Sequence, residues 1–158
     1  MEVTRKVLTL CLLKKDNQIL LGLKKRGFGQ GRWNGFGGKL ETGESIEEAA
    51  IRETEEECGV KLLDLKKFGQ LDFEFHDKLG NIMEVHLFTS ENFSGEPVET
   101  EEMKPQWFQI SEIPFAEMWA DDEHWFPLFL EGKKFKGKFL FGENDLVLEK
   151  ELIEVELI

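Results

Sequence analysis

Gly38-Lys-Leu-Glu-Thr-Gly-Glu44, followed after seven residues by Arg52-Glu-Thr-Glu-Glu-Glu-Cys-Gly-Val60, is the stretch that decides the fold of this chain. Between the two runs, Ser45 and Glu48 have the spacing of a capping box, which marks the start of a helix. Gly59 can adopt the left-handed conformation that commonly ends one. The stretch therefore predicts a glycine-rich turn followed by a helix.

Three carboxylates lie on one face of this helix, which we expect to span about residues 45–58. Glu53, Glu56 and Glu57 stand at positions i, i+3 and i+4, where each like-charged pair destabilises a helix by about 0.2–0.5 kcal/mol. A solvated acidic surface is one interpretation. However, Arg52 is the only basic residue in the helix, and the glycine-rich turn suits close approach of the backbone to phosphate. The pattern therefore favours Mg²⁺ held between the carboxylates and the phosphates of a substrate.

The spacing of these residues resembles the Nudix box, GX5EX7REUXEEXGU, in which U is an aliphatic residue. Thr54 stands where an aliphatic residue is expected, and we interpret it as a substitution within the core. The resemblance implies the Nudix fold, an α/β (mixed α+β) architecture with a mixed β-sheet between helices. It also implies hydrolysis of a nucleoside diphosphate linked to another group, with a divalent metal ion. The matching residues are Gly38, Glu44, Arg52, Glu53, Glu56, Glu57, Gly59 and Val60.

The composition narrows the class of protein. The chain has 158 residues, 41% of them hydrophobic, and a formal net charge of −12, which predicts one domain over residues 1–158. The negative charge argues against a nucleic-acid partner, which requires a basic surface. The apolar run Val7–Leu13 is too short to span a membrane, and Cys11 and Cys58 are expected to be reduced thiols. We expect a cytoplasmic monomer that takes a small nucleotide, and the sequence leaves a mitochondrial or nuclear share open.

Alternating apolar residues predict strands on both sides of the acidic helix. Residues 26–39 hold six glycines and are expected to form a loop. A second helix is predicted to begin at Asp121 or Asp122 and to run to about Leu130. Strands interrupted by two helices indicate an α+β or α/β sandwich. The predicted strands cover residues 3–13, 18–24, 65–75, 83–90, 107–110, 133–141 and 146–155, and the last two form a hairpin.

A candidate base pocket lies in the run Trp119-Ala-Asp-Asp122. The indole offers a stacking face, and two carboxylates in one apolar pocket cannot easily both be ionised. One proton shared by the pair provides a donor and an acceptor together, which could read more than one oxidised purine. The alternative interpretation is a helix N-terminus, where the helix dipole favours aspartate.

A closer resemblance extends over essentially the whole chain. It is to the branch of the Nudix family that hydrolyses oxidised purine nucleoside triphosphates, and it rests on the runs Gly22–Gly29, Gly31–Lys39, Phe73–Phe75 and Trp119–Asp122. Ala120 departs from that branch, which has proline before the two aspartates. We expect this difference to loosen the backbone there.

This resemblance assigns site residues by position. For the base, it implies hydrogen bonds to Asn34, Asp121 and Asp122, packing of Trp119 and Phe28 on the two faces, and a lining of Phe73, Phe75, Met83 and Met103. For the rest of the nucleotide, it implies contacts near the sugar from Thr9 and Lys24 and a loop beside the phosphates formed by Phe36, Gly37, Gly38 and Lys39. For Mg²⁺, with Mn²⁺ as a substitute, it implies ligation by Glu53, Glu56, Glu57, Glu102 and the Gly38 carbonyl.

The implied reaction is hydrolysis of 8-oxo-dGTP and 2-hydroxy-dATP to the monophosphate and pyrophosphate, which cleanses the nucleotide pool. A carboxylate of the cluster accepts a proton from the attacking water, and both Glu57 and Glu102 are candidates. Arg52 is expected to act in catalysis by orienting the glutamates through bidentate pairing, with Glu44 supporting them from behind. Two alternatives stay open: another Nudix pyrophosphohydrolase acting on dinucleotides or nucleotide sugars, and a binding module without turnover.

Overall fold

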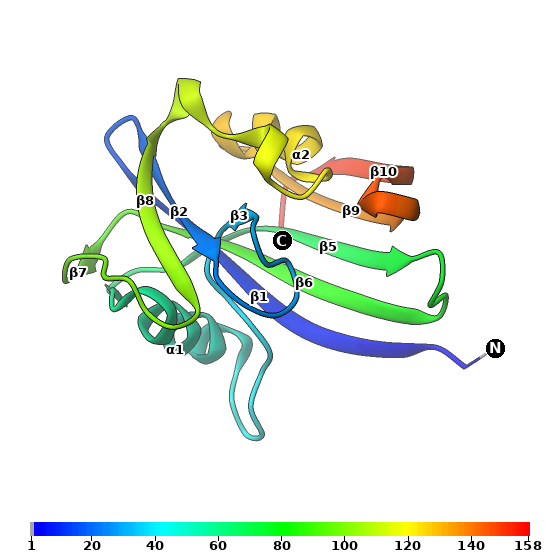
Figure 1. Cartoon of the computed structure of the whole chain (residues 1–158), viewed down its shortest axis with the longest axis horizontal. Helices are drawn as coiled ribbons and strands as arrows, with labels where there is room; N and C mark the ends of the chain where they lie inside the picture. Colours follow the sequence, from blue (N-terminus) through cyan, green and yellow to red (C-terminus); the bar gives the residue numbers. More distant parts are fainter. Residues whose placement is uncertain (1) are drawn as a thin grey trace.

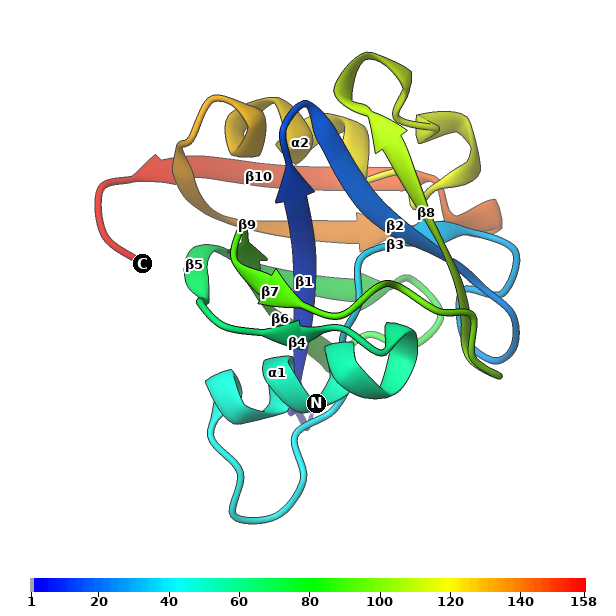
Figure 2. The ribbon, with the colours of Figure 1, turned by 90° about the vertical axis from the view of Figure 1, so that its left-hand side faces the viewer.

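The computed structural model describes residues 2–158, in which a mixed β-sheet lies between two α-helices. Figures 1 and 2 show α1 and α2 on opposite sides of the strands. The helices are α1 (Ile46–Cys58) and α2 (Asp122–Leu130), and the short 3-10 turns are η1 (Ile110–Glu112), η2 (Phe115–Glu117) and η3 (Glu143–Asp145). The strands are β1 (Thr4–Lys15), β2 (Gln18–Lys24), β3 (Trp33–Asn34), β4 (Lys61–Leu62), β5 (Lys66–Phe75), β6 (Asn81–Ser90), β7 (Phe93–Ser94), β8 (Met103–Gln109), β9 (Lys134–Phe141) and β10 (Val147–Val155).

The main sheet combines parallel and antiparallel pairs. Within the described residues it has eight strands in the order β10-β9-β5-β6-β1-β2-β3, and β8 pairs with β2 outside this path. The pairs β1–β6 and β5–β9 are parallel, whereas the other pairs in this sheet are antiparallel. This mixed sheet between helices confirms the predicted fold class.

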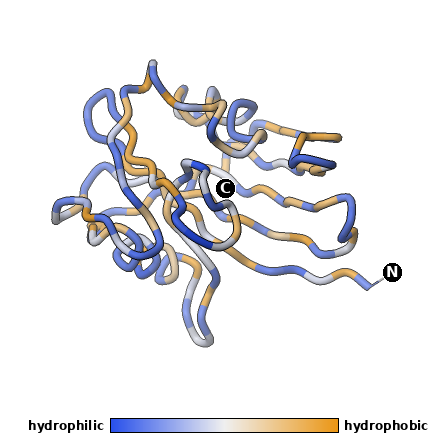
Figure 3. The backbone as a smooth tube through the Cα atoms, viewed as in Figure 1, coloured by the Kyte–Doolittle hydropathy of each residue, from blue (hydrophilic) through white to orange (hydrophobic). Residues whose placement is uncertain are grey.

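A separate hydrophobic core fills each face of the sheet. Trp125, Phe126 and Phe129 of α2 pack on one face, and Ala50 and Cys58 of α1 pack on the other. Figure 3 shows hydrophobic segments along the central strands and hydrophilic ones along much of α1. Neither helix of residues 2–158 is long and apolar enough to cross a membrane.

Local signals set both ends of α1. Ser45 Oγ accepts a hydrogen bond from the Glu48 amide at 3.1 Å, and Glu48 Oε1 accepts one from the Ser45 amide at 3.0 Å. Gly59 ends the helix with φ of 75°. The predicted capping box and left-handed end are confirmed. Thr54 is fully buried and its hydroxyl donates to the Ala50 carbonyl at 2.8 Å, which confirms that it is a core residue.

Three parts of the fold differ from the sequence prediction. The strand predicted at 107–110 is β8, which begins four residues earlier and ends at Gln109 because it pairs with β2 over its whole length. The loop predicted at 26–39 contains the short strand β3. A small sheet of β4 and β7 was not predicted, since two-residue strands show no alternation.

Candidate active site

Helix α1 presents the three glutamates of its acidic face at different depths. The side chain of Glu57 is 6% exposed, that of Glu53 19% and that of Glu56 59%. Glu57 lies inward because it follows the buried Thr54 and Ala50 on the apolar stripe of the helix. The acidic face therefore runs from the edge of the core to solvent.

Arg52 ties this face to the loop before the helix. Its Nε and Nη2 donate to the two carboxylate oxygens of Glu44 at 2.6 and 2.9 Å, and Nη2 also donates to the Lys39 carbonyl at 3.0 Å. Its Nη1 donates to Glu53 at 2.9 Å and to Glu56 at 3.2 Å. The guanidinium lowers the pKa of Glu44. A bidentate pair of this kind fixes direction as well as distance, so Arg52 sets where the glutamates point.

The buried carboxylate of Glu57 faces the glycine-rich loop. Its Oε1 accepts a hydrogen bond of 2.7 Å from the Gly37 amide, and its Oε2 lies 3.9 Å from Lys24 Nζ. Burial raises the pKa of Glu57 to about 7; Gly37 and Lys24 oppose the rise, and Glu53 and Glu102 add to it. A carboxylate that titrates near neutrality is suited to accept a proton.

Glu102, the residue directly before β8, has a different environment. Its carboxylate accepts hydrogen bonds from Arg26 at 2.6 and 2.8 Å and from Lys24 Nζ at 3.2 Å. The Arg26 guanidinium, and then Lys24, lower its pKa. Glu102 is therefore a paired, ionised carboxylate, whereas Glu57 is poised to exchange a proton.

The predicted metal ligands are divided between cationic partners. Glu53 and Glu56 point to Arg52, and Glu102 points to Lys24 and Arg26. Among residues 2–158, no three His, Cys, Asp or Glu side chains are gathered so that they could hold a metal ion. The carboxylates are thus neighbours in the fold without forming a closed cluster.

The loop before α1 approaches β1 more closely than a side chain would allow. The Thr9 amide donates to the Gly38 carbonyl at 2.9 Å. A Cβ on Gly37 would lie 1.8 Å from the Thr9 carbonyl oxygen, and one on Gly38 would lie 2.7 Å from the carboxyl carbon of Glu53. Only glycine fits both positions. Phe36 belongs to the loop through its backbone, but its side chain is fully buried in the core beside α1.

A cavity of about 700 Å³ opens beside this loop on the α2 side of the sheet, a size typical of small-molecule sites. Of the predicted metal ligands within residues 2–158, only Glu57 and Gly38 line the cavity. Phe36 is the one predicted nucleotide-binding residue that does not line the cavity. The predicted residues that line it are Thr9, Lys24, Phe28, Asn34, Gly37, Gly38, Lys39, Phe73, Phe75, Met83, Met103, Trp119, Asp121 and Asp122.

Two adjacent carboxylates are buried in the inner wall of this cavity. Asp121 is 4% exposed and Asp122 is 2% exposed. Asp121 Oδ2 accepts a hydrogen bond of 2.8 Å from Trp125 Nε1, while Asp122 Oδ2 has no partner within residues 2–158. Burial raises the pKa of both groups, and the charge of Asp121 raises that of Asp122 further. Two buried carboxylates side by side disfavour double ionisation, so the pair favours a state in which it holds one proton.

Asp121 and Asp122 lie at the N-terminus of α2, where the helix dipole favours aspartate. Asp121 occupies the N-cap position of α2, but its side chain makes no capping hydrogen bond. Burying two carboxylates without a cationic contact is costly. Recognition of a polar ligand by the pair stays a prediction beside stabilisation of the helix.

Phe28 and Trp119 stack directly on each other. Their ring centroids are 5.0 Å apart at an interplanar angle of 28°, and Phe75 meets Phe28 edge-on at 5.9 Å. A base stacked between two rings requires about 7 Å, because each carbon contact takes about 3.5 Å. The two rings must separate before they can pack on both faces of a base, and Phe28 is the exposed member of the pair, at 61%.

The sequence prediction did not include several residues that contribute to this site. Lys6, Gly29 and Lys78 also line the cavity, and Arg32 packs behind Trp119 with its Cζ 4.1 Å from the ring centroid. Lys6 lies beside the site because β1 pairs with β6 far along the chain, and Lys78 lies in the turn between β5 and β6. Arg32 lies within Gly31–Lys39, one of the runs on which the resemblance rests. That run was the signal from which Arg32 could have been predicted.

A comparison of the sequence with protein-family models identifies the family. The model described as the NUDIX domain matches residues 3–129. The chain belongs to the Nudix family.

Individual proteins resemble it over nearly its full length. It is 53% identical to the oxidized purine nucleoside triphosphate hydrolase of Danio rerio and 50% identical to that of Mus musculus, each over 153 residues and 97% of both chains. It also superposes on the crystal structure of a MutT protein from Bacillus halodurans with a TM-score of 0.83. That structure is 27% identical, and the match covers 93% of this chain and 97% of the other.

Proposed function

We propose that this chain hydrolyses oxidised purine nucleoside triphosphates, such as 8-oxo-dGTP and 2-hydroxy-dATP, to the monophosphate and pyrophosphate. The observation that carries this proposal is the buried pair Asp121 and Asp122 in the wall of an aromatic cavity. The names of the Danio rerio and Mus musculus relatives support it. The reaction would remove damaged nucleotides from the pool.

Three side chains are placed to read the base. Asn34 Oδ1 accepts a hydrogen bond from the Gly35 amide at 2.8 Å, so both amide hydrogens of Asn34 remain free to donate. With one proton held by the pair Asp121 and Asp122, one carboxylate accepts and the other donates. This set of donors and acceptors distinguishes purine edges by the order of their polar groups.

The acidic end of the site fits a hard divalent cation, because every donor there is an oxygen. Mg²⁺, for which Mn²⁺ can substitute, would be held by Glu53, Glu56, Glu57, Glu102 and the Gly38 carbonyl and would neutralise charge on the phosphoryl oxygens. The Gly38 carbonyl accepts from the Thr9 amide at 2.9 Å and more weakly from the Thr9 hydroxyl at 3.4 Å, so binding of the ion would require the hydroxyl to turn away. Turning Glu102 away from Lys24 would free that ammonium, which lines the cavity, for the nucleotide.

Glu57 is proposed as the proton acceptor. A water oxygen forms a bond to phosphorus, the bridging P–O bond breaks, pyrophosphate leaves and the proton of the water passes to Glu57. The pKa of Glu57, raised to about 7 by burial, and its place in the cavity lining support this choice. The pKa of Glu102 is lowered by Arg26 and Lys24, which makes it the weaker base.

We further propose that residues 1–158 form a single Nudix hydrolase domain that works as a cytoplasmic monomer. The family match ends at residue 129, but β9 and β10 continue the same sheet beyond it. The formal charge of −12 supports a nucleotide rather than a nucleic acid as partner. Sedimentation of the purified protein tests the oligomeric state.

A substrate panel tests the activity. Purified protein would be incubated with 8-oxo-dGTP, 2-hydroxy-dATP, dGTP, ADP-ribose and a diadenosine polyphosphate, with Mg²⁺ and with EDTA, and products separated by ion exchange. We expect Mg²⁺-dependent release of monophosphate and pyrophosphate, fastest for the oxidised purines. Faster cleavage of ADP-ribose or the dinucleotide would assign another pyrophosphohydrolase. Ligand-induced thermal stabilisation without turnover would assign a binding module.

A pair of variants tests the proton acceptor. Glu57→Gln should lower kcat by about 100-fold or more. Glu55→Gln is the matched control, because Glu55 lies on the exposed side of the same helix. Wild-type kcat in Glu57→Gln would remove Glu57 from the catalytic centre.

A further inference from the structure

The charged side chains that line the cavity differ in sign according to their depth. Within residues 2–158, its carboxylates are those of Glu57, Asp121 and Asp122, and all three residues are buried. The other charged residues of the lining lie closer to solvent and are all lysines: Lys6, Lys24, Lys39 and Lys78. The outer part of the cavity is therefore positively charged, although the whole chain has a formal charge of −12.

Lys6 faces the cavity because of its place on β1. Successive side chains of a strand point to opposite faces, and Leu8, two positions further on, packs against the core beside α2. The neighbouring Arg5 points to the other face, where its Nη1 lies 3.2 Å from Asp72 and 3.1 Å from Glu84. The charge of Arg5 is thus balanced by two carboxylates, whereas that of Lys6 is directed toward the cavity.

Lys39 reaches the same part of the cavity from the glycine-rich loop. It forms an isolated antiparallel bridge with Leu8, and residues opposite each other in such a pair share a face of the sheet. Lys39 is therefore the diagonal neighbour of Lys6, at a separation of about 7–8 Å across which long side chains meet. The Lys39 ammonium is the largest influence that lowers the pKa of Lys6, so the two cations lie side by side.

Neither of these two lysines has an anionic partner among the described residues. The lysines that form salt bridges within residues 2–158 are Lys14, Lys24, Lys25 and Lys133. Two neighbouring charges of like sign repel each other, and an anion between them removes the repulsion. The pair Lys6 and Lys39, exposed at the cavity, therefore has the character of an anion site.

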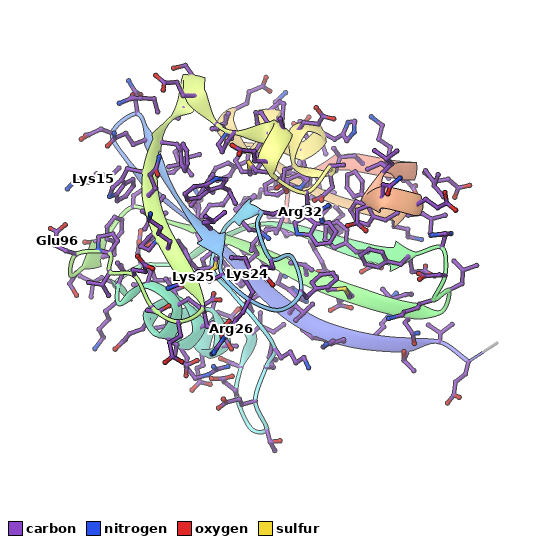
Figure 4. All side chains as sticks on the ribbon, in the orientation of Figure 1. Lys15, Lys24, Lys25, Arg26, Arg32 and Glu96 are labelled. Atoms are coloured by element: carbon purple, nitrogen blue, oxygen red, sulfur yellow. The ribbon has the colours of Figure 1, made fainter. Side chains whose placement is uncertain are left out.

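The position of this pair relative to the acidic end indicates which anion it takes. Lys24 lies nearer to α1 than Arg32 does (Figure 4), and its Nζ is 3.2 Å from Glu102. Gly38, whose carbonyl belongs to the proposed metal site, directly precedes Lys39, and consecutive Cα atoms are about 3.8 Å apart. A triphosphate whose reacting phosphate lies at the metal site can thus place its outer phosphates against the lysine pair.

We propose that Lys6, together with Lys39, binds the two outer phosphates of the substrate and so selects triphosphates over diphosphates and monophosphates. The inference rests on the proposed function, because it concerns the tail of the same substrate. The phosphates held by the two lysines are those that leave as pyrophosphate. Lys6 is therefore a specificity-determining residue that responds to the number of phosphates, while the base is read elsewhere in the cavity.

The test compares nucleotides that differ only in their number of phosphates. Dissociation constants of 8-oxo-dGMP, 8-oxo-dGDP and 8-oxo-dGTP would be determined by calorimetry in EDTA, for wild type and Lys6→Met. Loss of one ammonium group should weaken binding of the triphosphate by about two- to five-fold and leave the affinity for the monophosphate unchanged, with the diphosphate between them. In Mg²⁺, the KM for 8-oxo-dGTP should rise more than kcat falls.

Three further variants separate the local contact from net charge. Lys39→Met should lower the ratio of triphosphate to monophosphate affinity in the same direction as Lys6→Met. Lys6→Arg keeps a cation that binds phosphate and should retain the wild-type ratio. Lys138→Met is the matched control and should also retain it, because Lys138 pairs in register with Asp72, on the face of the sheet to which Arg5 points.

Two results would overturn the inference. One is a folded Lys6→Met with the wild-type ratio of triphosphate to monophosphate affinity or, if that variant does not fold, Lys39→Met with that ratio. The other is an equal loss of triphosphate affinity in Lys138→Met, which would assign the effect to net charge. A wild type with the expected affinities that cleaves no triphosphate contradicts the proposed function alone. Cleavage by wild type with an unchanged ratio in Lys6→Met contradicts this inference alone.

Discussion

The Gly37 amide donates a 2.7 Å hydrogen bond to Glu57 Oε1 and so joins the glycine-rich loop to the buried end of the acidic helix. The bond stabilises the ionised form of a carboxylate that burial otherwise disfavours. Burial is the larger influence, since it raises the pKa of Glu57 from 4.5 to about 7. Residue 57 therefore makes the folded protein less stable at high pH than an uncharged residue would.

Glu57→Gln should flatten the dependence of stability on pH. Between pH 4.5 and about 7 the unfolded chain has released the Glu57 proton and the folded protein has kept it, so the free energy of unfolding of wild type falls as pH rises. The fall from this group is about 3 kcal/mol and is complete above pH 7. Urea unfolding in EDTA at pH 4.5 and 8 should show a smaller fall in the variant. Glu55→Gln should behave as wild type, and equal falls in all three proteins would contradict the assignment.

Gly37→Ala should destabilise the protein severely. The new Cβ would lie 1.8 Å from the Thr9 carbonyl oxygen, so the loop must leave β1, at a cost of about 3 kcal/mol. Gly43→Ala is the comparison, because a Cβ on residue 43 would meet no atom within 4 Å. This variant has only the backbone strain of a φ of 84°, which costs about 1 kcal/mol. Thermal unfolding measures both. Similar losses in the two variants would show that the close approach is not the cause.

Arg52→Lys should lower kcat more than it changes KM. A lysine cannot bond both oxygens of Glu44 in one plane, so Glu53 and Glu56 lose their common anchor. Loss of a residue that orients ligands typically costs about ten-fold or more. Steady-state kinetics on 8-oxo-dGTP would show the split, with Arg5→Lys as the control for the chemical change. Retention of full kcat by Arg52→Lys would assign the residue a purely structural role.

Thr54→Val should preserve both fold and activity. The buried Thr54 hydroxyl donates to the Ala50 carbonyl, an acceptor that the helix already uses, and its other polar neighbour is the weakly hydrogen-bonding thiol of Cys11. We expect the free energy of unfolding to change by less than about 1 kcal/mol. Urea titration and turnover of 8-oxo-dGTP check this. A large loss of turnover at unchanged stability would show that the hydroxyl serves the site.

Local sequence signals were sufficient for the parts of the fold that are defined by short-range contacts. The capping box at Ser45 depends on residues three positions apart, and it lies where it was predicted. Strand β8 was predicted too short because Pro105, which cannot donate a hydrogen bond to a neighbouring strand, argues against a strand there. Proline is tolerated there because β8 pairs with β2 alone.

The sequence predicted the part of the site whose residues lie within the Nudix motif. The acidic face of α1 and its pairing with Arg52 depend on residues within one segment of chain. The salt bridges of Glu102 with Lys24 and Arg26, and of Arg32 with Asp145, join residues 76 to 113 positions apart, and no local pattern encodes them. The direct stacking of Phe28 on Trp119 depends likewise on where two irregular segments meet.

The parallel pairing of β5 with β9 joins Gly69 to Phe135 and Phe75 to Phe141. During synthesis, β5 has no neighbour on that side until β9, which begins about 60 residues after β5 ends, has emerged from the ribosome. Until then an apolar strand edge that favours self-association is open to other nascent chains. Cells that make this protein rapidly should therefore need chaperones to protect it, and deletion of residues 134–158 should yield insoluble material rather than a smaller enzyme.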